Sequence, residues 1–117
     1  VHEGPQRIGK NVNGVALLPG MVLSNEPGYY RADGFGIRIE NLVTVQHCQA
    51  LTGAEREMYE FDVLTHIPMD ARLIDKSLLT DVEVNWFNQY QQKVHQTLAP
   101  LMQGDELTWL NKVTAAI

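Results

Sequence analysis

Two glutamates, Glu26 and Glu40, have the spacing best suited to chemistry. They lie at equal distances in sequence from Asp33, and the pair Asp33-Gly34 is typical of a tight hairpin turn. If the flanking segments pair antiparallel through that turn, the two glutamates stand opposite each other, with Cβ atoms about 4.5–5.5 Å apart on one face. Two carboxylates at that distance repel each other, and one or two cations between them remove the repulsion. Hydrolytic sites with two metal ions about 3.5–4 Å apart use bridging carboxylates of this kind.

The same pair of glutamates also fits arrangements without a metal. Arg38 lies two residues before Glu40, so both side chains would point to the same side of a strand. Its guanidinium can orient a carboxylate, or form a surface ion pair that contributes little to stability. A slip of one residue in the register would place the two carboxylates on opposite faces. Spacing alone therefore leaves a metal site, an ion pair and a solvated face as alternatives.

A second motif, His2-Glu3-Gly4-Pro5, holds a histidine in a loop that glycine and proline restrict. Histidine can donate a hydrogen bond to a developing oxyanion, or transfer a proton near neutral pH. The same residue is also compatible with an uninvolved loop position. The remaining histidines are far apart and lack ligand spacing, and Cys48 has no recognisable activating neighbour, so we expect an inert thiol there.

The elements that position these residues follow from local patterns. Apolar and β-branched residues between Gly- and Pro-containing turns predict strands over residues 21–26, 36–47 and 60–67, with residues 29–35 as a loop. On the strand that carries Arg38 and Glu40, alternation directs Ile37 and Ile39 to the opposite side. We expect those two isoleucines to enter a hydrophobic layer.

From residue 75 onward the pattern changes to a helical period. Thr80 and Glu83 match a capping box, in which each side chain satisfies a free backbone N–H of the other. Apolar residues then recur every fourth position, which predicts an amphipathic helix about five turns long. Pro100 should kink or end its last turn, and a short final helix is expected after Gly104. The recurring positions are Val82, Trp86, Tyr90, Val94 and Leu98.

This order, antiparallel strands followed by a helical tail, predicts the α+β fold class. Of the 117 residues, 44% are hydrophobic and 20% are charged, as in globular proteins. A net charge of −5 with dispersed Lys and Arg argues against a nucleic-acid partner, and no apolar run suggests a membrane segment. One cysteine and no visible secretory leader indicate a reducing, cytoplasmic setting.

Three motifs, taken in order, resemble the C-terminal half of the pita-bread metallopeptidase domain of family M24. They are VHEGP at residues 1–5, LLPGMVLSNEPGYY at 17–30 and GFGIRIENLVTV at 34–45. From residue 59 onward, the sequence is similar to the C-terminal extension of the larger Xaa-Pro aminopeptidases, also called aminopeptidases P. The resemblance covers essentially the whole chain. It implies the C-terminal part of a pita-bread domain over residues 1–67 and a helical extension over 68–117.

The resemblance also implies a role for each matching residue. Glu26 and Glu40 would bind two divalent metal ions, usually manganese in bacterial members, and Glu40 would bridge both. Glu26 would also serve as the general base or proton shuttle. His2 would contact the substrate near the scissile peptide and help to stabilise the tetrahedral intermediate. The catalytic residues would be His2, Glu26 and Arg38. Arg38 and Tyr30 would also form hydrogen bonds around the metal carboxylates and keep them oriented.

The implied reaction removes the N-terminal residue from a peptide with proline in second position, in a homodimeric enzyme. The family pattern also needs two aspartates and two histidines before VHEGP, the motif that opens this chain. We therefore expect the chain alone to bind metal weakly or not at all and to be inactive. Two alternatives remain: a non-catalytic pita-bread module that binds peptides or histones, and a helical tail that forms a dimer interface through its aromatic residues.

Overall fold

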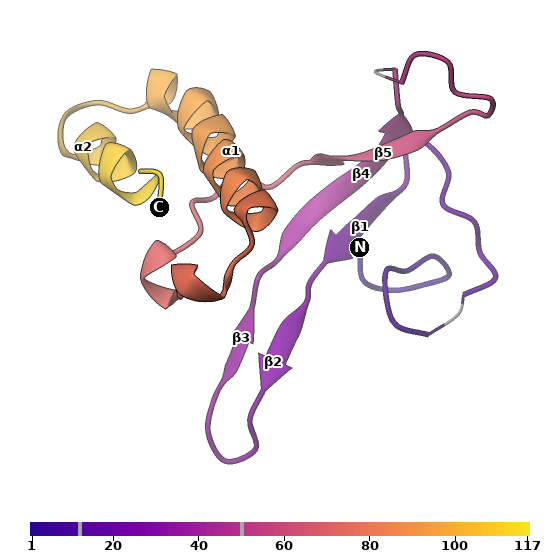
Figure 1. The fold of residues 1–117 in the computed structure, drawn as a ribbon, viewed down its shortest axis with the longest axis horizontal. Helices are drawn as coiled ribbons and strands as arrows, with labels where there is room; N and C mark the ends of the chain where they lie inside the picture. The colour runs from indigo at the N-terminus through magenta and orange to yellow at the C-terminus, as the bar shows by residue number, and fades with distance from the viewer. Residues whose placement is uncertain (12, 50) are drawn as a thin grey trace. The chain divides into compact units, whose positions relative to one another are not determined.

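The structure is a computed structural model that describes residues 1–11, 13–49 and 51–117 (Figure 1). It divides into two compact units, Val1–Thr65 and His66–Ile117. Within the described residues, the first unit contains five β-strands and the second contains two α-helices and three short 3-10 helices. The sequence predicts this order of elements, with strands first and helices after them.

The first unit is built on one long antiparallel hairpin that a third strand extends. Its outer part forms a two-stranded ladder, and its inner part joins β5 in a three-stranded sheet with the order β1-β4-β5. The strands are β1 (Val22–Asn25), β2 (Gly28–Tyr30), β3 (Gly36–Arg38), β4 (Asn41–His47) and β5 (Tyr59–Val63). Figure 1 shows β2 and β3 leading away from the sheet to the hairpin tip.

The register of this hairpin agrees with the prediction. In the inner ladder Asn25 pairs with Asn41, and in the outer ladder Gly28 pairs with Arg38. Both pairs are centred on Asp33, which has a φ of 54° and so takes the left-handed turn conformation that Asp tolerates. The predicted register is confirmed on both sides of Glu26 and Glu40, which occupy the segment between the two ladders.

Three of the predicted boundaries are wrong. Residues 36–47 form two strands instead of one, because the ladder breaks opposite Pro27, which has no N–H to donate. There the amide of Ile39 donates to the carbonyl of Pro27 at 3.1 Å. Tyr29 and Tyr30, expected in a loop, form β2 because they pair with β3 across the hairpin. The third strand, β5, ends at Val63, earlier than predicted.

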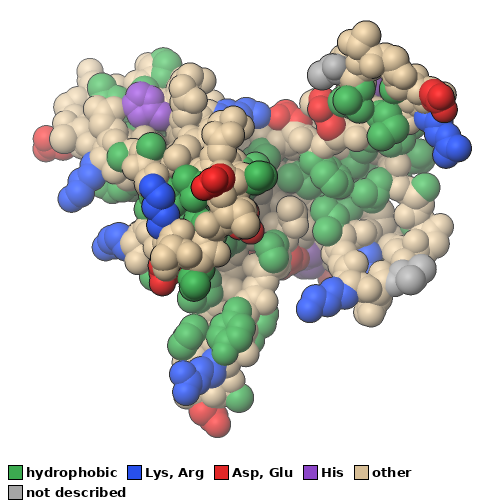
Figure 2. All heavy atoms as spheres, in the orientation of Figure 1, with side chains coloured by type: hydrophobic (Ala, Val, Ile, Leu, Met, Phe, Trp, Pro, Cys, Tyr) green, Lys and Arg blue, Asp and Glu red, His purple; other side chains and the backbone are tan. Residues whose placement is uncertain are grey.

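The core of the first unit lies on the three-stranded sheet. Leu23, Val43 and Val45 are buried, and Val63 is among the partly buried residues packed against them. The expectation that Ile37 and Ile39 enter a hydrophobic layer is wrong for this chain, because their exposed fractions are 41% and 48%. Figure 2 shows hydrophobic side chains at the surface of this hairpin and over the sheet.

The second unit is helical, and its main helix begins as predicted. In α1 (Asp81–Leu98) the capping box is present: the amide of Glu83 donates to Oγ1 of Thr80 at 3.3 Å, and the amide of Thr80 donates to Glu83 Oε2 at 2.8 Å. A 3-10 turn, η3 (Ala99–Leu101), contains Pro100 and ends the helix. The other elements are η1 (Ala71–Leu73), η2 (Lys76–Leu78) and α2 (Gly104–Val113). No helix in the described ranges is both long and apolar enough to cross a bilayer.

The buried face of α1 differs in part from the predicted stripe. Tyr90 and Val94 are buried as predicted, but Val82 and Trp86 are 79% and 52% exposed. The predicted stripe is therefore buried only from Tyr90 onward. Phe87 is also buried, so Phe87 and Tyr90 belong to the core of this unit while Trp86 remains half exposed.

Candidate metal centre

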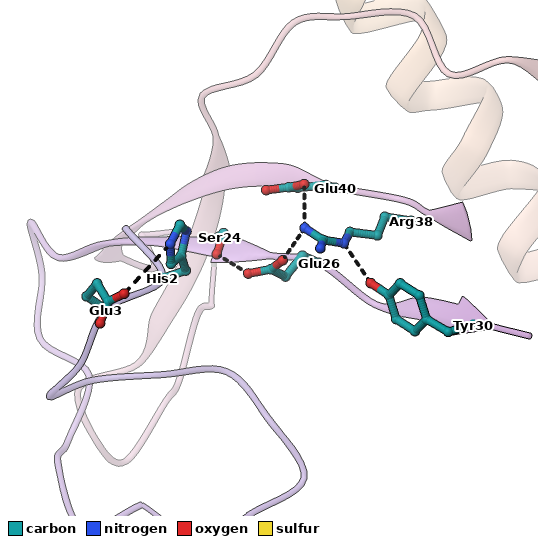
Figure 3. Close-up of polar contacts among 7 residues, drawn as sticks. All are labelled: His2, Glu3, Ser24, Glu26, Tyr30, Arg38 and Glu40. Atoms are coloured by element: carbon teal, nitrogen blue, oxygen red, sulfur yellow. Dashed lines mark hydrogen bonds and ion pairs between the residues drawn. The ribbon is translucent and has the colours of Figure 1, made fainter. Parts of the chain in front are cut away.

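One face of the β2–β3 hairpin and its inner continuation carries the residues singled out in the sequence (Figure 3). Alternation along paired strands places every second residue on the same face. That face carries two glutamates, a tyrosine, an arginine and two glycines. In order they are Glu26, Gly28 and Tyr30 on the first side of the hairpin, and Gly36, Arg38 and Glu40 on the second.

Arg38 is the centre of this face. Its Nη1 lies 3.0 Å from Oε2 of Glu26 and 3.9 Å from Oε2 of Glu40, and its Nε donates a hydrogen bond to the Tyr30 hydroxyl at 2.6 Å. The hydrogen bond and the electrostatic interaction with Tyr30, followed by the charge of Glu26, raise the pKa of Arg38 above its usual value. The guanidinium therefore stays charged and holds both carboxylates toward one point.

A residue that the sequence analysis missed holds Glu26 from its other side. Oγ of Ser24 donates a hydrogen bond to Oε1 of Glu26 at 2.8 Å, and Ser24 is buried. Because Arg38 binds Oε2, each oxygen of the Glu26 carboxylate has its own donor. The available signal was position, since Ser24 lies two residues before Glu26 and so shares its face of the strand.

His2 lies beside the same carboxylate. The amide of Ser24 donates to the carbonyl of Val1 at 3.1 Å, which ties the first residues of the chain to β1. The His2 side chain is 67% exposed, and its Nε2 lies 3.9 Å from Oε1 of Glu3. His2 and Glu26 line one small hollow, and Figure 3 shows the His2 ring on the side of Ser24 and Glu26. The full lining is Val1, His2, Gln6, Arg7, Ile8, Leu23, Ser24 and Glu26.

This arrangement fits part of a site for hard divalent cations. Glu26 and Glu40 approach the same cationic nitrogen, so the two carboxylates already converge on one position. Carboxylate oxygens are the donors that manganese and magnesium prefer. Across the described part of the chain, no group of three or more His, Cys, Asp or Glu side chains could hold a metal ion. Two carboxylates, those of Glu26 and Glu40, are therefore the acidic donors that this face offers to a metal ion. The ion pair considered as an alternative is present too, with Arg38 between the carboxylates.

Comparison with known proteins identifies the class. The model of metallopeptidase family M24 matches residues 1–47, and the model of the C-terminal region of peptidase M24 matches residues 57–117. The chain therefore belongs to metallopeptidase family M24.

Within that family, the chain is similar to aminopeptidases P. It is 44% identical to a probable Xaa-Pro aminopeptidase P of Coprinopsis cinerea, over 100% of this chain and 20% of the relative. It is 43% identical to aminopeptidase P2 of Arabidopsis thaliana, over 89% of this chain and 15% of the relative. The chain thus spans about one-fifth or less of the length of these curated relatives.

A solved structure matches the fold. The X-prolyl aminopeptidase of Caenorhabditis elegans, described as a cytosolic enzyme with a di-nuclear active site, superposes with a TM-score of 0.82 at 37% identity. The match covers 100% of this chain and 20% of that one. It confirms the predicted fold class: antiparallel strands followed by a helical region, as the C-terminal part of a pita-bread fold.

Proposed function

We propose that this chain is the C-terminal part of a two-metal aminopeptidase that removes the N-terminal residue from peptides with proline in second position. The observation that carries the proposal is that Glu26 and Glu40 lie on one face and are both directed toward Arg38, in a chain similar to aminopeptidases P throughout. Residues 1–67 belong to the pita-bread metallopeptidase domain, and residues 68–117 form its helical extension.

Two divalent ions bound at such a site supply Lewis acidity and a nucleophilic water at neutral pH. Glu26 and Glu40 would hold these ions, and Glu26 would also act as the general base or proton shuttle. Arg38 and Tyr30 keep the two carboxylates oriented, which is the role their contacts support. His2, on the exposed side of the hollow beside Glu26, contacts the substrate near the scissile bond and stabilises the developing negative charge.

The oxygen donors suit manganese, which we propose as the metal. The remaining ligands come from a part of the protein that precedes the VHEGP motif. We infer a cytoplasmic homodimer as the working form of the whole enzyme; the description of the C. elegans enzyme as cytosolic supports the location. The 117-residue chain by itself is expected to be inactive, because its described residues gather too few ligands to hold two ions.

The proposal is tested in the full-length protein that contains this chain. Glu26→Gln and Glu40→Gln keep the size of each side chain but remove its charge, so manganese-dependent release of the residue before proline should fall by at least about 100-fold in both. Glu60→Gln, which changes an exposed carboxylate on β5, is the matched control and should retain full activity. Near-wild-type turnover by either Glu26→Gln or Glu40→Gln would overturn the assignment.

The same experiment separates the enzyme from the non-catalytic binding module. A binding module has no chemical need for the acidic pair. If the full-length protein is such a module, it shows no turnover, and neither substitution changes its affinity for a peptide. The 117-residue chain provides a second check: substantial hydrolysis of an Xaa-Pro peptide by the isolated chain would contradict the proposed division of the ligands.

A further inference from the structure

Two glycines on the polar face of the hairpin are not explained by backbone conformation. Gly28 lies in β2 and Gly36 in β3, and neither has a positive φ. Glycine inside a strand lowers stability, because it loses more conformational freedom on folding and has no side chain to pack. Two such residues in one short hairpin therefore require a reason that lies outside the backbone.

The reason is the ring of Tyr30. Tyr30 faces Gly36 directly across the ladder, and it follows Gly28 by two residues on the same face. A Cβ at Gly28 would lie 2.7 Å from the Tyr30 hydroxyl oxygen and 2.9 Å from its Cε2, and a Cβ at Gly36 would lie 2.8 Å from its Cδ1. Real Cβ atoms essentially never lie within 3.0 Å of such a neighbour, so an added Cβ and the ring could not both keep these positions. The two glycines thus form a flat seat, and the Tyr30 ring lies across it.

This placement of the ring sets the position of the Tyr30 hydroxyl oxygen. Lying flat along the hairpin, the ring brings its oxygen to 2.6 Å from Nε of Arg38. With Nε engaged, Nη1 of the same guanidinium reaches Glu26 at 3.0 Å and faces Glu40 at 3.9 Å. Because the guanidinium is a rigid plane, holding its Nε restricts where Nη1 can lie. The position of the ring therefore bears on the direction of both carboxylates.

We propose that Gly28 and Gly36 are positioning residues of the site, because their missing side chains let Tyr30 lie flat and hold Arg38 against the two glutamates. This inference rests on the proposed function. In this chain Tyr30 is 63% exposed and its ring is the flexible partner of each close contact, so an added methyl group at either glycine displaces the ring and leaves the hairpin folded. The site then keeps its ligands but loses their orientation.

The first test is structural and uses crystal structures of the full-length protein. In Gly28→Ala, the Tyr30 hydroxyl should lie beyond hydrogen-bond distance, about 3.5 Å, from Nε of Arg38. Gly14→Ala is the matched control, because a Cβ at Gly14 meets no atom within 4 Å. Gly36→Ala gives a second variant with the same expected displacement, should Gly28→Ala not yield folded protein. A Tyr30 hydroxyl still bonded to Arg38 in these variants overturns the proposal.

The second test is kinetic. Gly28→Ala should lower kcat for an Xaa-Pro peptide about tenfold with little change in KM, while Gly14→Ala matches the wild type in both. Tyr30→Phe should cause a similar loss, and the double variant Gly28→Ala/Tyr30→Phe should be no worse than the poorer single variant. A loss in the double variant equal to the product of the two single losses overturns the proposal, because Gly28 would then make room for something other than Tyr30.

Failure of this inference and failure of the proposed function remain distinguishable. If the unmodified full-length protein releases no residue before proline, the proposed function fails. The crystal structure of Gly28→Ala still decides whether the glycine seats Tyr30, since that readout does not depend on turnover.

Discussion

Ser24, buried in β1, donates a hydrogen bond from its Oγ to Oε1 of Glu26, which lies two residues later, just beyond the end of that strand. This contact and the opposite one from Arg38 give the Glu26 carboxylate a single orientation. A flexible glutamate on an open hairpin would lose rotamer freedom on binding a cation, and the two donors remove part of that loss in advance. The orientation of Glu26 is thus a property of this chain alone.

Replacing Ser24 should therefore weaken the site without removing a ligand. Ser24→Ala leaves Oε1 of Glu26 without its donor, so metal affinity or kcat of the full-length protein should fall by about tenfold. Ser24→Thr keeps the hydroxyl and should retain most of the activity, and Ser77→Ala, a change in η2, serves as the control. Metal content measured alongside turnover checks the prediction, and wild-type values for Ser24→Ala would refute it.

Asp70 should titrate well below an ordinary aspartate. Hydrogen bonds from the Arg72 side chain and backbone lower the pKa of Asp70 from 3.8 to about 2. The pKa of Asp70 is lower in the folded state than in the unfolded chain. The stability contributed by its contacts with Arg72 is therefore present above pH 3.8 and is lost as the pH falls from 3.8 towards 2. NMR titration of the Asp70 carboxyl carbon measures the value directly.

Arg72→Gln provides the control for this titration. It removes the charged partner, so the pKa of Asp70 should rise towards its ordinary value. The pKa of Asp75 is lowered chiefly by hydrogen bonds from Ser77 and should not move in the same variant. An unchanged Asp70 titration in Arg72→Gln would show that another cause lowers the pKa.

Gln91 should be the most sensitive polar residue of the helical unit. It is fully buried; its Nε2 donates to the carbonyls of Met69 and Val113, and its Oε1 accepts from the amide of Met69. Gln91→Leu leaves these three backbone groups without their partner, at a cost of about 2 kcal/mol or more in the free energy of unfolding. Urea unfolding of the 117-residue chain measures the loss.

The exposed Gln96 on the same helix supplies the comparison. Gln96→Leu should change the free energy of unfolding by no more than about 0.5 kcal/mol. Equal effects of the two substitutions would mean that the amide of Gln91 does not hold the preceding segment and α2 to α1.

Local rules were sufficient for several features of this protein. The turn at Asp33 and the hairpin register depend on neighbouring residues along one stretch of chain, so the sequence by itself determined that Glu26 and Glu40 lie opposite each other. The capping box of Thr80 and Glu83 is likewise a contact within one helical turn. The motifs around these glutamates also identified the family.

Tertiary contacts decided the rest. Pairing with β3 made a strand of Tyr29 and Tyr30, and the Tyr30 ring selected a position over two glycines that no periodicity indicates. The burial of Gln91 depends on backbone groups 22 residues away in either direction. Such contacts are set by which faces meet after folding, and a propensity or a spacing rule carries no information about the partner. Arg38 illustrates the division: its strand and face were predictable, but its simultaneous contacts with Tyr30 and Glu26 were decided in three dimensions.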